Sequence, residues 1–380
     1  MIGSGDTRRR FITVALVTLL AGCKVVPTGA PEAPPPAPDL ESLPADGQRH
    51  RVALLVPLAG PNAAAGQAIA NAAAMALLDT DAKNLRITNY DTSAGAAPAA
   101  AKAMADGNRL ILGPLVTSDI AAVSSTARAA RIPVISFTSD PDGARSGVFV
   151  MGNLPEQSIR RTVDYARLQG ASRFAALVPV GDYGQRASAA MAASVRSAGG
   201  TVTAMETFDR SNTSLVSAAR RLATKGGYDA VLVADGGRAA SQAAPLLKRA
   251  GAKVRLLGTE LWSGDAAAAA APLRGAWYSA VSDARFGQFS TSYRNRFGAA
   301  PGRVATLGYD AVLLTLRIAR DWRPGSPFPT ARLADTGGFL GLDGPFRFGA
   351  DGVVQRAMEV RELRAGGHTV VSPAPSRFHD

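Results

Sequence analysis

The stretch RVALLVPLAGPNAAAGQAIANAAAMALLDTDAKNLRITNYD, residues 51–91, decides the fold. Its first part, RVALLVP (51–57), is a short apolar run that is typical of a buried parallel strand. The alanine-rich segment at 66–79 predicts a helix, and LRITNYD (85–91) predicts a second strand. Residues 51–91 are therefore expected to form one β-α-β unit, in which a helix connects two parallel strands.

The same alternation continues along the chain. Further strands are predicted at 109–114, 132–137, 173–180, 201–208, 228–235 and 253–260, and helices at 96–107, 118–130, 184–200, 214–226 and 237–251. Parallel strands that alternate with helices of this length form sheets covered by helices on both faces. Two such series predict an α/β protein with two doubly wound, Rossmann-like lobes. Ligand-binding residues are expected in the loops beyond the carboxyl ends of the strands.

The order of the elements also predicts how the two lobes share the chain. A first crossover is expected within 147–170, and two helices at 288–297 and 304–320 are expected to return to the first lobe. The glycine-rich end is expected to form a terminal hairpin on the second lobe. The predicted boundaries are 49–152 and 282–325 for lobe 1, 153–281 and 326–372 for lobe 2, and 373–380 for a tail.

The N-terminus predicts export. Three arginines at 8–10 precede the apolar run FITVALVTLLA (11–21), which is too short to cross a hydrocarbon layer of roughly 30 Å as a helix. A basic segment followed by a short apolar one is typical of a secretory signal peptide. Such a signal is expected at residues 1–22.

The one cysteine of the sequence, Cys23, ends the motif LAGC, which resembles the lipobox of bacterial lipoproteins. The resemblance implies cleavage before Cys23 and a lipid on its thiol, and Lys24 at the next position implies sorting to the outer membrane. The alternative is a free thiol behind an uncleaved anchor. Seven prolines between Pro27 and Pro44 predict an extended, lipidated tether at 23–48.

Composition and motifs exclude several classes of function. The net charge is +12, but the basic residues are scattered and form no basic helix, so no nucleic-acid partner is predicted. The motifs HExxH, CxxC, GxSxG, GxGxxG and the P-loop do not occur, so no enzyme activity, metal or cofactor is predicted. The acidic pair Asp140 and Asp142 is the catalytic alternative. The three histidines, His50, His368 and His379, are predicted to lie on the surface.

Several motifs, taken in order, resemble the type I periplasmic binding proteins of the leucine/isoleucine/valine-binding branch over about residues 49–372. They are VALLVPLAGPNAAAGQ, LILGPLVTSDIAAVSSTARAARIPVISFTSD, LVPVGDYGQ, LLGTELW, LGYDAVLL and GPFRFGADG. The resemblance implies two lobes that close by hinge motion on an amino acid or small amide held between them.

The resemblance also implies which residues line that interlobe cleft. Ser118, Ser136, Thr138 and Ser139 fall where family members hold a ligand carboxylate, Tyr183 falls at the aromatic contact of the other lobe, and Glu260 falls where an acidic side chain accepts a ligand ammonium. The alternatives are structural: the hydroxyls satisfy turns, the tyrosine anchors a loop, and the glutamate pairs with an arginine. Asp140 and Asp142 depart from the family pattern, because negative charge opposes an anionic ligand unless Arg145 compensates it.

The lipobox, the tether and the segments LILGPLVTSD and VISFTSD also resemble a second group with the same fold, the penicillin-binding protein activators. These are outer-membrane lipoproteins that stimulate a cell-wall synthase through the peptidoglycan layer. Two functions are therefore expected as alternatives. One is an activator of a class A penicillin-binding protein in peptidoglycan synthesis, and the other is a substrate-binding receptor that delivers an amino acid or amide to an ABC permease.

Overall fold

The computed structural model describes residues 45–211, 213–250, 254–265 and 269–378. The predicted signal peptide, Cys23 and the proline-rich segment up to residue 44 lie outside the described residues. Residues 44–380 form one compact unit. Among the described helices, none combines the length and the apolar character that a membrane crossing requires.

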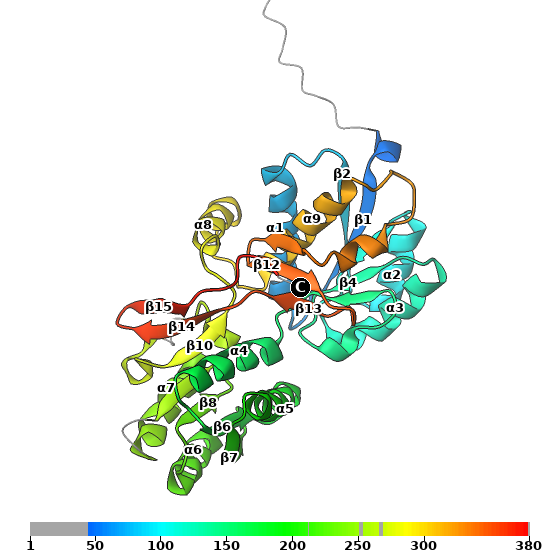
Figure 1. The fold of residues 1–380 in the computed structure, drawn as a ribbon. Helices are drawn as coiled ribbons and strands as arrows, with labels where there is room; N and C mark the ends of the chain where they lie inside the picture. The colour runs from blue at the N-terminus through cyan, green and yellow to red at the C-terminus, as the bar shows by residue number, and fades with distance from the viewer. Residues whose placement is uncertain (1–44, 212, 251–253, 266–268, 379–380) are drawn as a thin grey trace, which may run out of the picture. The chain divides into compact units, whose positions relative to one another are not determined.

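The first lobe is built on a parallel sheet of five strands among the described residues (Figure 1). Its order is β2 (Leu85–Asp91), β1 (His50–Val56), β3 (Leu110–Leu112), β4 (Val134–Ser136) and β5 (Val148–Val150). Helices α2 (Ala96–Ala105) and α3 (Ile120–Ala129) pack on one face, and α1 (Ala63–Asp79) and α9 (Ala305–Ala319) pack on the other. The predicted β-α-β unit at 51–91 is therefore present, with β1 and β2 in parallel register.

The second lobe is built on a seven-stranded sheet among the described residues. Its order is β15 (Gly367–Ser372), β14 (Glu359–Arg364), β10 (Trp277–Ala280), β9 (Arg255–Gly258), β8 (Ala230–Val233), β6 (Arg173–Pro179) and β7 (Thr201–Phe208). Helices α4 (Pro155–Leu168) and α5 (Asp182–Ser197) cover one face, and α6 (Ser214–Lys225) and α7 (Gly237–Leu247) cover the other. Strands β6 to β10 are parallel, so the predicted doubly wound α/β class is confirmed.

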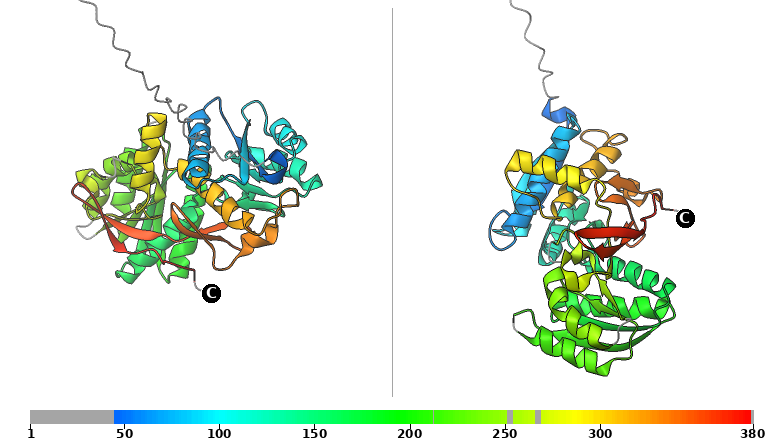
Figure 2. Two further views of the ribbon diagram at one scale, coloured as in Figure 1. Left: turned by 90° about the horizontal axis from the view of Figure 1, so that it is seen from above. Right: turned by 90° about the vertical axis from the view of Figure 1, so that its left-hand side faces the viewer.

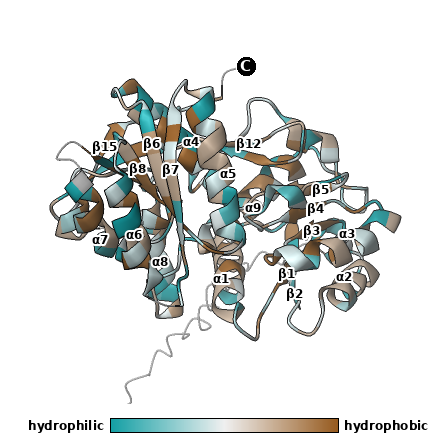
Figure 3. Cartoon of the chain, turned by 90° about the horizontal axis from the view of Figure 1, so that it is seen from below, coloured by the Kyte–Doolittle hydropathy of each residue, from teal (hydrophilic) through white to brown (hydrophobic). Residues whose placement is uncertain are grey.

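Buried apolar side chains fill the space between each sheet and its helices. The central strands β1, β3 and β8 are buried along their length or nearly so, whereas the helices bury one side only. Figure 3 shows apolar residues gathered along the strands and hydrophilic ones on the outer helices. This distribution explains why the strands read as continuous apolar runs in the sequence.

A glycine allows the helix after the first strand of each lobe, α1 after β1 and α5 after β6, to begin close to that strand. A Cβ atom on Gly66 would lie 1.8 Å from the carbonyl oxygen of Pro57, and one on Gly184 would lie 1.6 Å from that of Pro179. No side chain fits at either distance, so both turns require glycine. The two lobes therefore place the first turns of α1 and α5 near the strand ends by the same device.

The predicted boundary of lobe 2 at residue 326 is wrong for the segment up to Arg356. This segment forms a small third sheet of β11 (Phe339–Gly341), β12 (Gly344–Phe348) and β13 (Val354–Arg356). Phe346, Phe348 and Val354 lie in the core of lobe 1, since the aromatic side chains of β12 fill the space beside α9 and β5. The hairpin of β14 and β15 alone pairs with the lobe 2 sheet, as Figure 2 shows from two further sides.

The surface location predicted for His50 is also wrong. Its side chain is buried, with 3% of the residue exposed, and its ring stacks on Trp322 with the two ring centroids 4.2 Å apart. Trp322 follows α9, far away in the sequence. The imidazole is therefore part of the lobe 1 core, and burial lowers its pKa.

Charged side chains hold the segment that leads from β10 of lobe 2 toward α8 (Phe286–Phe297). Asp283 in this segment pairs with Arg303, which precedes α9 in lobe 1, and with Arg361 on β14 of lobe 2. Arg303 also donates to Asp343 at 2.9 Å, and Arg361 donates to Glu359 at 2.7 Å. One carboxylate thus connects an arginine of each lobe.

Candidate functional site

A cavity of about 370 Å³ lies between the lobes, at the carboxyl ends of β4, β6, β9 and β10. This volume is within the range of small-molecule sites, roughly 300–1,000 Å³. Its lining residues come from both lobes and from the connections between them: Ser139, Asn153, Pro155, Tyr183, Glu260, Leu261, Ser263, Ala280, Val281, Arg303 and Met358. The loops beyond the strand ends therefore meet where the topology predicts a ligand site.

Tyr183 and Glu260 form a hydrogen-bonded pair in the lobe 2 wall of the cavity. The Tyr183 hydroxyl lies 3.1 Å from Glu260 Oε1 and 3.0 Å from Thr259 Oγ1. Tyr183 lies in the first turn of α5, which follows β6, and the other two residues follow β9, so two strand ends on the same edge of the sheet position the pair. The hydroxyl has one proton, so it donates to one of these oxygens and accepts from the other where that group is protonated.

The environment of Glu260 favours its neutral form. Burial raises the pKa of the Glu260 carboxyl to about 7, and the nearby Glu156 carboxylate adds to the increase. Glu260 Oε2 is buried and has no hydrogen-bond partner among the described residues. Ser158 is near enough to lower this pKa slightly, but its hydroxyl proton is directed at the Ser279 carbonyl oxygen, 2.7 Å away. The cavity wall thus holds a carboxyl with an unused acceptor.

We expect Glu260→Gln to stabilise the protein at about pH 8 relative to the native chain, and to have little effect at about pH 5. The folded state holds the Glu260 proton up to a pKa of about 7, whereas the unfolded chain releases it near the ordinary glutamate pKa of 4.5. The free energy of unfolding of the native chain therefore falls by up to about 3 kcal/mol as the pH rises from below 4.5 to above about 7. Glutamine cannot ionise, so the variant does not show this decrease. Urea denaturation at both pH values measures the difference.

Glu206→Gln is the matched control for this prediction. Glu206 on β7 lies outside the cavity and pairs with Arg221 and Lys225, which lower the pKa of its carboxyl. Because the pKa of Glu206 is lowered, its carboxyl is ionised at both pH values. The effect of Glu206→Gln on stability should therefore be the same at about pH 5 and about pH 8. A Glu260→Gln effect that is equally independent of pH would contradict a raised pKa at Glu260.

The lobe 1 hydroxyls are placed differently from the tyrosine–glutamate pair. Ser136 is fully buried, and its hydroxyl donates to the Pro114 carbonyl oxygen at 2.9 Å. The Thr138 hydroxyl lies 2.6 Å from that of Thr117 and accepts from the backbone N–H of Asp140. Ser118 is exposed and does not line the cavity. Of the four hydroxyl residues singled out in lobe 1, Ser139 alone lines it.

Asp140 and Arg145, which follow Ser139 in the sequence, make contacts within their own loop. Asp140 caps the short turn that follows it, by accepting from the backbone N–H of Asp142. Arg145 donates to the Gly143 carbonyl oxygen and is exposed, so it does not line the cavity. Arg186 on α5 contacts a lining residue directly, because it donates to the Ser139 carbonyl oxygen. Its guanidinium also lies 3.9 Å from the carboxylate of Glu156.

Sequence reasoning did not identify Arg186, Asn153 or Arg303. Arg186 lies one helical turn after Tyr183, and this spacing on one helix face is a signal that could have found it. Asn153 lies in the crossover after β5, and Arg303 precedes α9, more than 100 residues from the other lining residues of its lobe. No local pattern marks these two positions.

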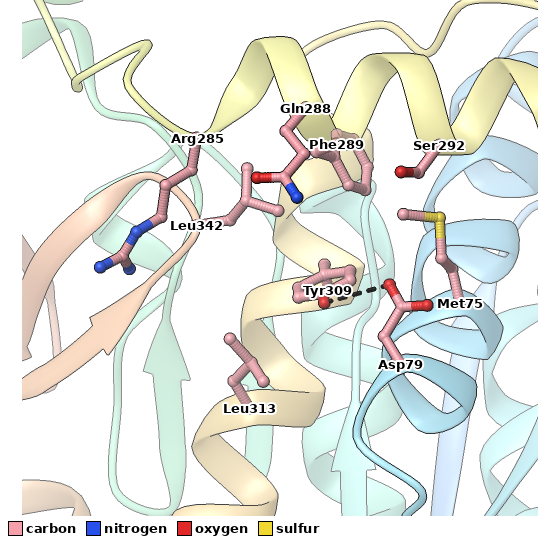
Figure 4. A pocket seen from close by; sticks show the side chains of 9 residues that line it. All are labelled: Met75, Asp79, Arg285, Gln288, Phe289, Ser292, Tyr309, Leu313 and Leu342. Carbon is pink, nitrogen blue, oxygen red and sulfur yellow. Dashed lines mark hydrogen bonds between the residues drawn. The ribbon is translucent and has the colours of Figure 1, made fainter.

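A second cavity, of about 340 Å³, lies within lobe 1 between α1, α8 and α9 (Figure 4). Met75, Phe289 and Leu342 contribute apolar walls, and the Tyr309 hydroxyl donates to Asp79 at 3.3 Å. Burial and the Asp79 charge raise the pKa of Tyr309 to about 12. Most residues of this cavity come from the three helices, and Leu342 comes from the turn between β11 and β12.

Within the described residues, no group of three histidine, cysteine or acidic side chains has the arrangement of a metal site. The acidic pair Asp140 and Asp142 is used in a turn.

Comparisons with known proteins agree with this geometry. Residues 50–368 match the family model described as periplasmic binding protein. A structure from Rhodospirillum rubrum assigned to branched-chain amino acid ABC transport is 20% identical, with a TM-score of 0.75 over 85% of this chain and 100% of that one. The isoleucine complex of the substrate-binding protein LivJ from Streptococcus pneumoniae is 20% identical, with a TM-score of 0.62 over 86% and 100%.

Two further relatives show how far the similarity extends. A solute-binding protein from R. palustris in complex with benzoate is 19% identical, with a TM-score of 0.62 over 86% of this chain and 98% of that one. An uncharacterized protein from Rickettsia prowazekii is 31% identical over 142 residues, which are 37% of this chain and 38% of that protein. The chain therefore belongs to the periplasmic binding protein family, whose members work in the periplasm, and it has the two-lobed type I fold that these solved structures share.

Proposed function

We propose that this protein is a non-enzymatic lipoprotein, anchored to the outer membrane through a lipid on Cys23, that activates a class A penicillin-binding protein in peptidoglycan synthesis. The lipobox, the proline-rich tether and the activator-like segments support this proposal. The tether would give reach, since proline-rich segments are extended by about 3.1 Å per residue.

The observation that carries the proposal is the state of the lobe 1 hydroxyls. An amino-acid receptor of this fold would need free donors for the ligand carboxylate, but the hydroxyls of Ser136 and Thr138 are engaged within lobe 1 and Ser118 lies away from the cavity. Asp140 adds negative charge beside them. Of the four hydroxyl residues expected to hold a ligand carboxylate, Ser139 alone lines the cavity, which supports a role other than amino-acid transport.

Reconstitution tests the activator role. The mature chain with Cys23→Ser, which keeps the protein free of lipid, would be added to a purified class A penicillin-binding protein from the same source. We expect direct binding and an increase in glycan polymerisation or crosslinking. A matched reaction with an unrelated periplasmic binding protein of this fold controls for the architecture. Absence of both binding and stimulation would contradict the proposal.

A second candidate is a substrate-binding receptor for an ABC permease, which the Tyr183–Glu260 pair in the cavity favours. The cleft would then be the transport site, whereas in an activator it would be a regulatory ligand site. Thermal unfolding with amino acids and small amides tests this function, because a ligand at 100 times its Kd should stabilise the fold by roughly 2.7 kcal/mol. No shift across the panel would count against transport.

A further inference from the structure

The cavity between the lobes has an excess of unused hydrogen-bond acceptors. Asn153 Oδ1, Glu156 Oε2 and Glu260 Oε2 are buried and have no partner among the described residues. Asn153 and Glu260 line the cavity, and Glu156 follows the lining residue Pro155. Buried acceptors without a donor are unfavourable by about 1–3 kcal/mol each, so a ligand that supplies N–H groups would relieve that penalty.

The cations around the cavity are already engaged. Arg303 lines the cavity between two carboxylates, Asp283 and Asp343. Arg186 faces Glu156 and the Ser139 carbonyl oxygen. The guanidinium of Arg210 lies 5.7 Å from the centroid of the Tyr183 ring and pairs with Asp235 at 2.8 Å.

Arg303, which lines the cavity, keeps one N–H group without a partner in the part of the chain that the structure describes. The Nε atom of Arg303 is buried and has no partner among the described residues. Since two carboxylates compensate the charge of this guanidinium, its remaining N–H suits a neutral carbonyl or hydroxyl oxygen better than a second anion. Because carboxylates already compensate the guanidinium groups around the cavity, its charges favour a ligand with N–H donors and a neutral acceptor over a ligand with a carboxylate.

We infer that the cleft binds a small primary amine with a net positive charge, such as an amino-acid amide or a diamine, and discriminates against the zwitterionic amino acid of the same shape. The ammonium would lie against Glu260 and Asn153, and an amide oxygen would face Arg303. The inference rests on the proposal that the cleft is a ligand site. The ligand of this site is then a small organic cation.

Isothermal titration of the mature Cys23→Ser chain with four probes tests the inference at about pH 7. The probes are leucinamide, putrescine, leucine and 4-methylpentanoate, which separate an ammonium with a neutral acceptor, a dication, a zwitterion and an anion. We expect leucinamide to bind at least about tenfold more tightly than leucine, and 4-methylpentanoate to be the weakest. Glu260→Gln should weaken leucinamide binding by about tenfold or more, because the ammonium loses its charged partner.

Glu206→Gln makes the same chemical change in the same lobe but outside the cavity, and it should leave leucinamide binding unchanged. Leucine binding as tight as that of leucinamide would overturn the charge class while leaving the cleft as a ligand site. No binding of any probe at millimolar concentration would overturn both. Stimulation of the penicillin-binding protein is measured separately, so loss of the ligand inference would not be confused with loss of the activator role.

Discussion

Replacing Arg361 with alanine is expected to destabilise the protein by about 3–5 kcal/mol, a large part of the stability of an ordinary domain. The Arg361 side chain is fully buried and donates to Asp283 at 2.5 Å, to Glu359 at 2.7 Å and to the Val281 carbonyl oxygen at 2.7 Å. Alanine would leave two carboxylates without this cation in a low-dielectric environment. It would also release the segment after β10 that leads from one lobe to the other.

Arg364→Ala is the matched control, because it removes the same side chain three residues later on β14. Arg364 is largely exposed and pairs with Glu362 at 3.0 Å, so its loss should change stability by less than about 1 kcal/mol. Urea denaturation of the two variants and the native chain measures both effects. A loss below about 1 kcal/mol for Arg361→Ala would show that the buried network does not stabilise the connection.

The parts of the fold that are local in sequence were predictable. Continuous apolar runs such as RVALLVP have the signature of buried parallel strands, and the strands β1, β2, β6 and β7 lie within a residue or two of their predicted bounds. Alanine-rich amphipathic segments predicted the helices in the same way. Their alternation then predicted parallel sheets with helices on both faces, but not the order of the strands within each sheet.

Placement that depends on distant residues was not predictable. The segment after residue 326 has the alternation of a hairpin, but alternation does not say which sheet it packs on. The aromatic side chains Phe346 and Phe348 fill a space beside α9 that exists only after lobe 1 has folded. His50 stacks on Trp322, although the two residues lie far apart in the sequence. No pattern in the sequence around either residue predicts this contact.

The candidate site was predictable in part for the same reason. Tyr183, Glu260 and Ser139 line the cavity because each follows shortly after the end of a strand. Ser136 and Thr138 also lie there, but their hydroxyls face the neighbouring loop and bond to Pro114 and Thr117. Strand-end position predicts proximity to a site, whereas the direction of a side chain depends on neighbours that the sequence does not identify. The ligand-binding role of all six residues stays a prediction.

Gly184→Ala is expected to destabilise the protein by roughly 2–4 kcal/mol and to weaken leucinamide binding by about tenfold or more. The added methyl group would lie 1.6 Å from the carbonyl oxygen and 2.7 Å from the carbonyl carbon of Pro179, so the first turn of α5 must move away from β6. Tyr183 is the preceding residue, and its hydroxyl would move out of reach of Glu260, now 3.1 Å away. One methyl group should thus disturb the fold and the cavity together.

Gly287→Ala is the matched control, because Gly287 is also in a helix, α8. Outside its own helix turn, no atom lies within 4 Å of the position that its Cβ would take, so this variant lacks the clash with a preceding strand. Alanine has the higher helix propensity, so this control should be neutral or more stable by up to about 1 kcal/mol. Thermal unfolding and titration with leucinamide are measured on both variants. If Gly184→Ala were as stable as Gly287→Ala, the strand–helix turn would tolerate a side chain and glycine would not position Tyr183. If it were destabilised but bound leucinamide normally, the tyrosine–glutamate pair would not depend on the position of α5.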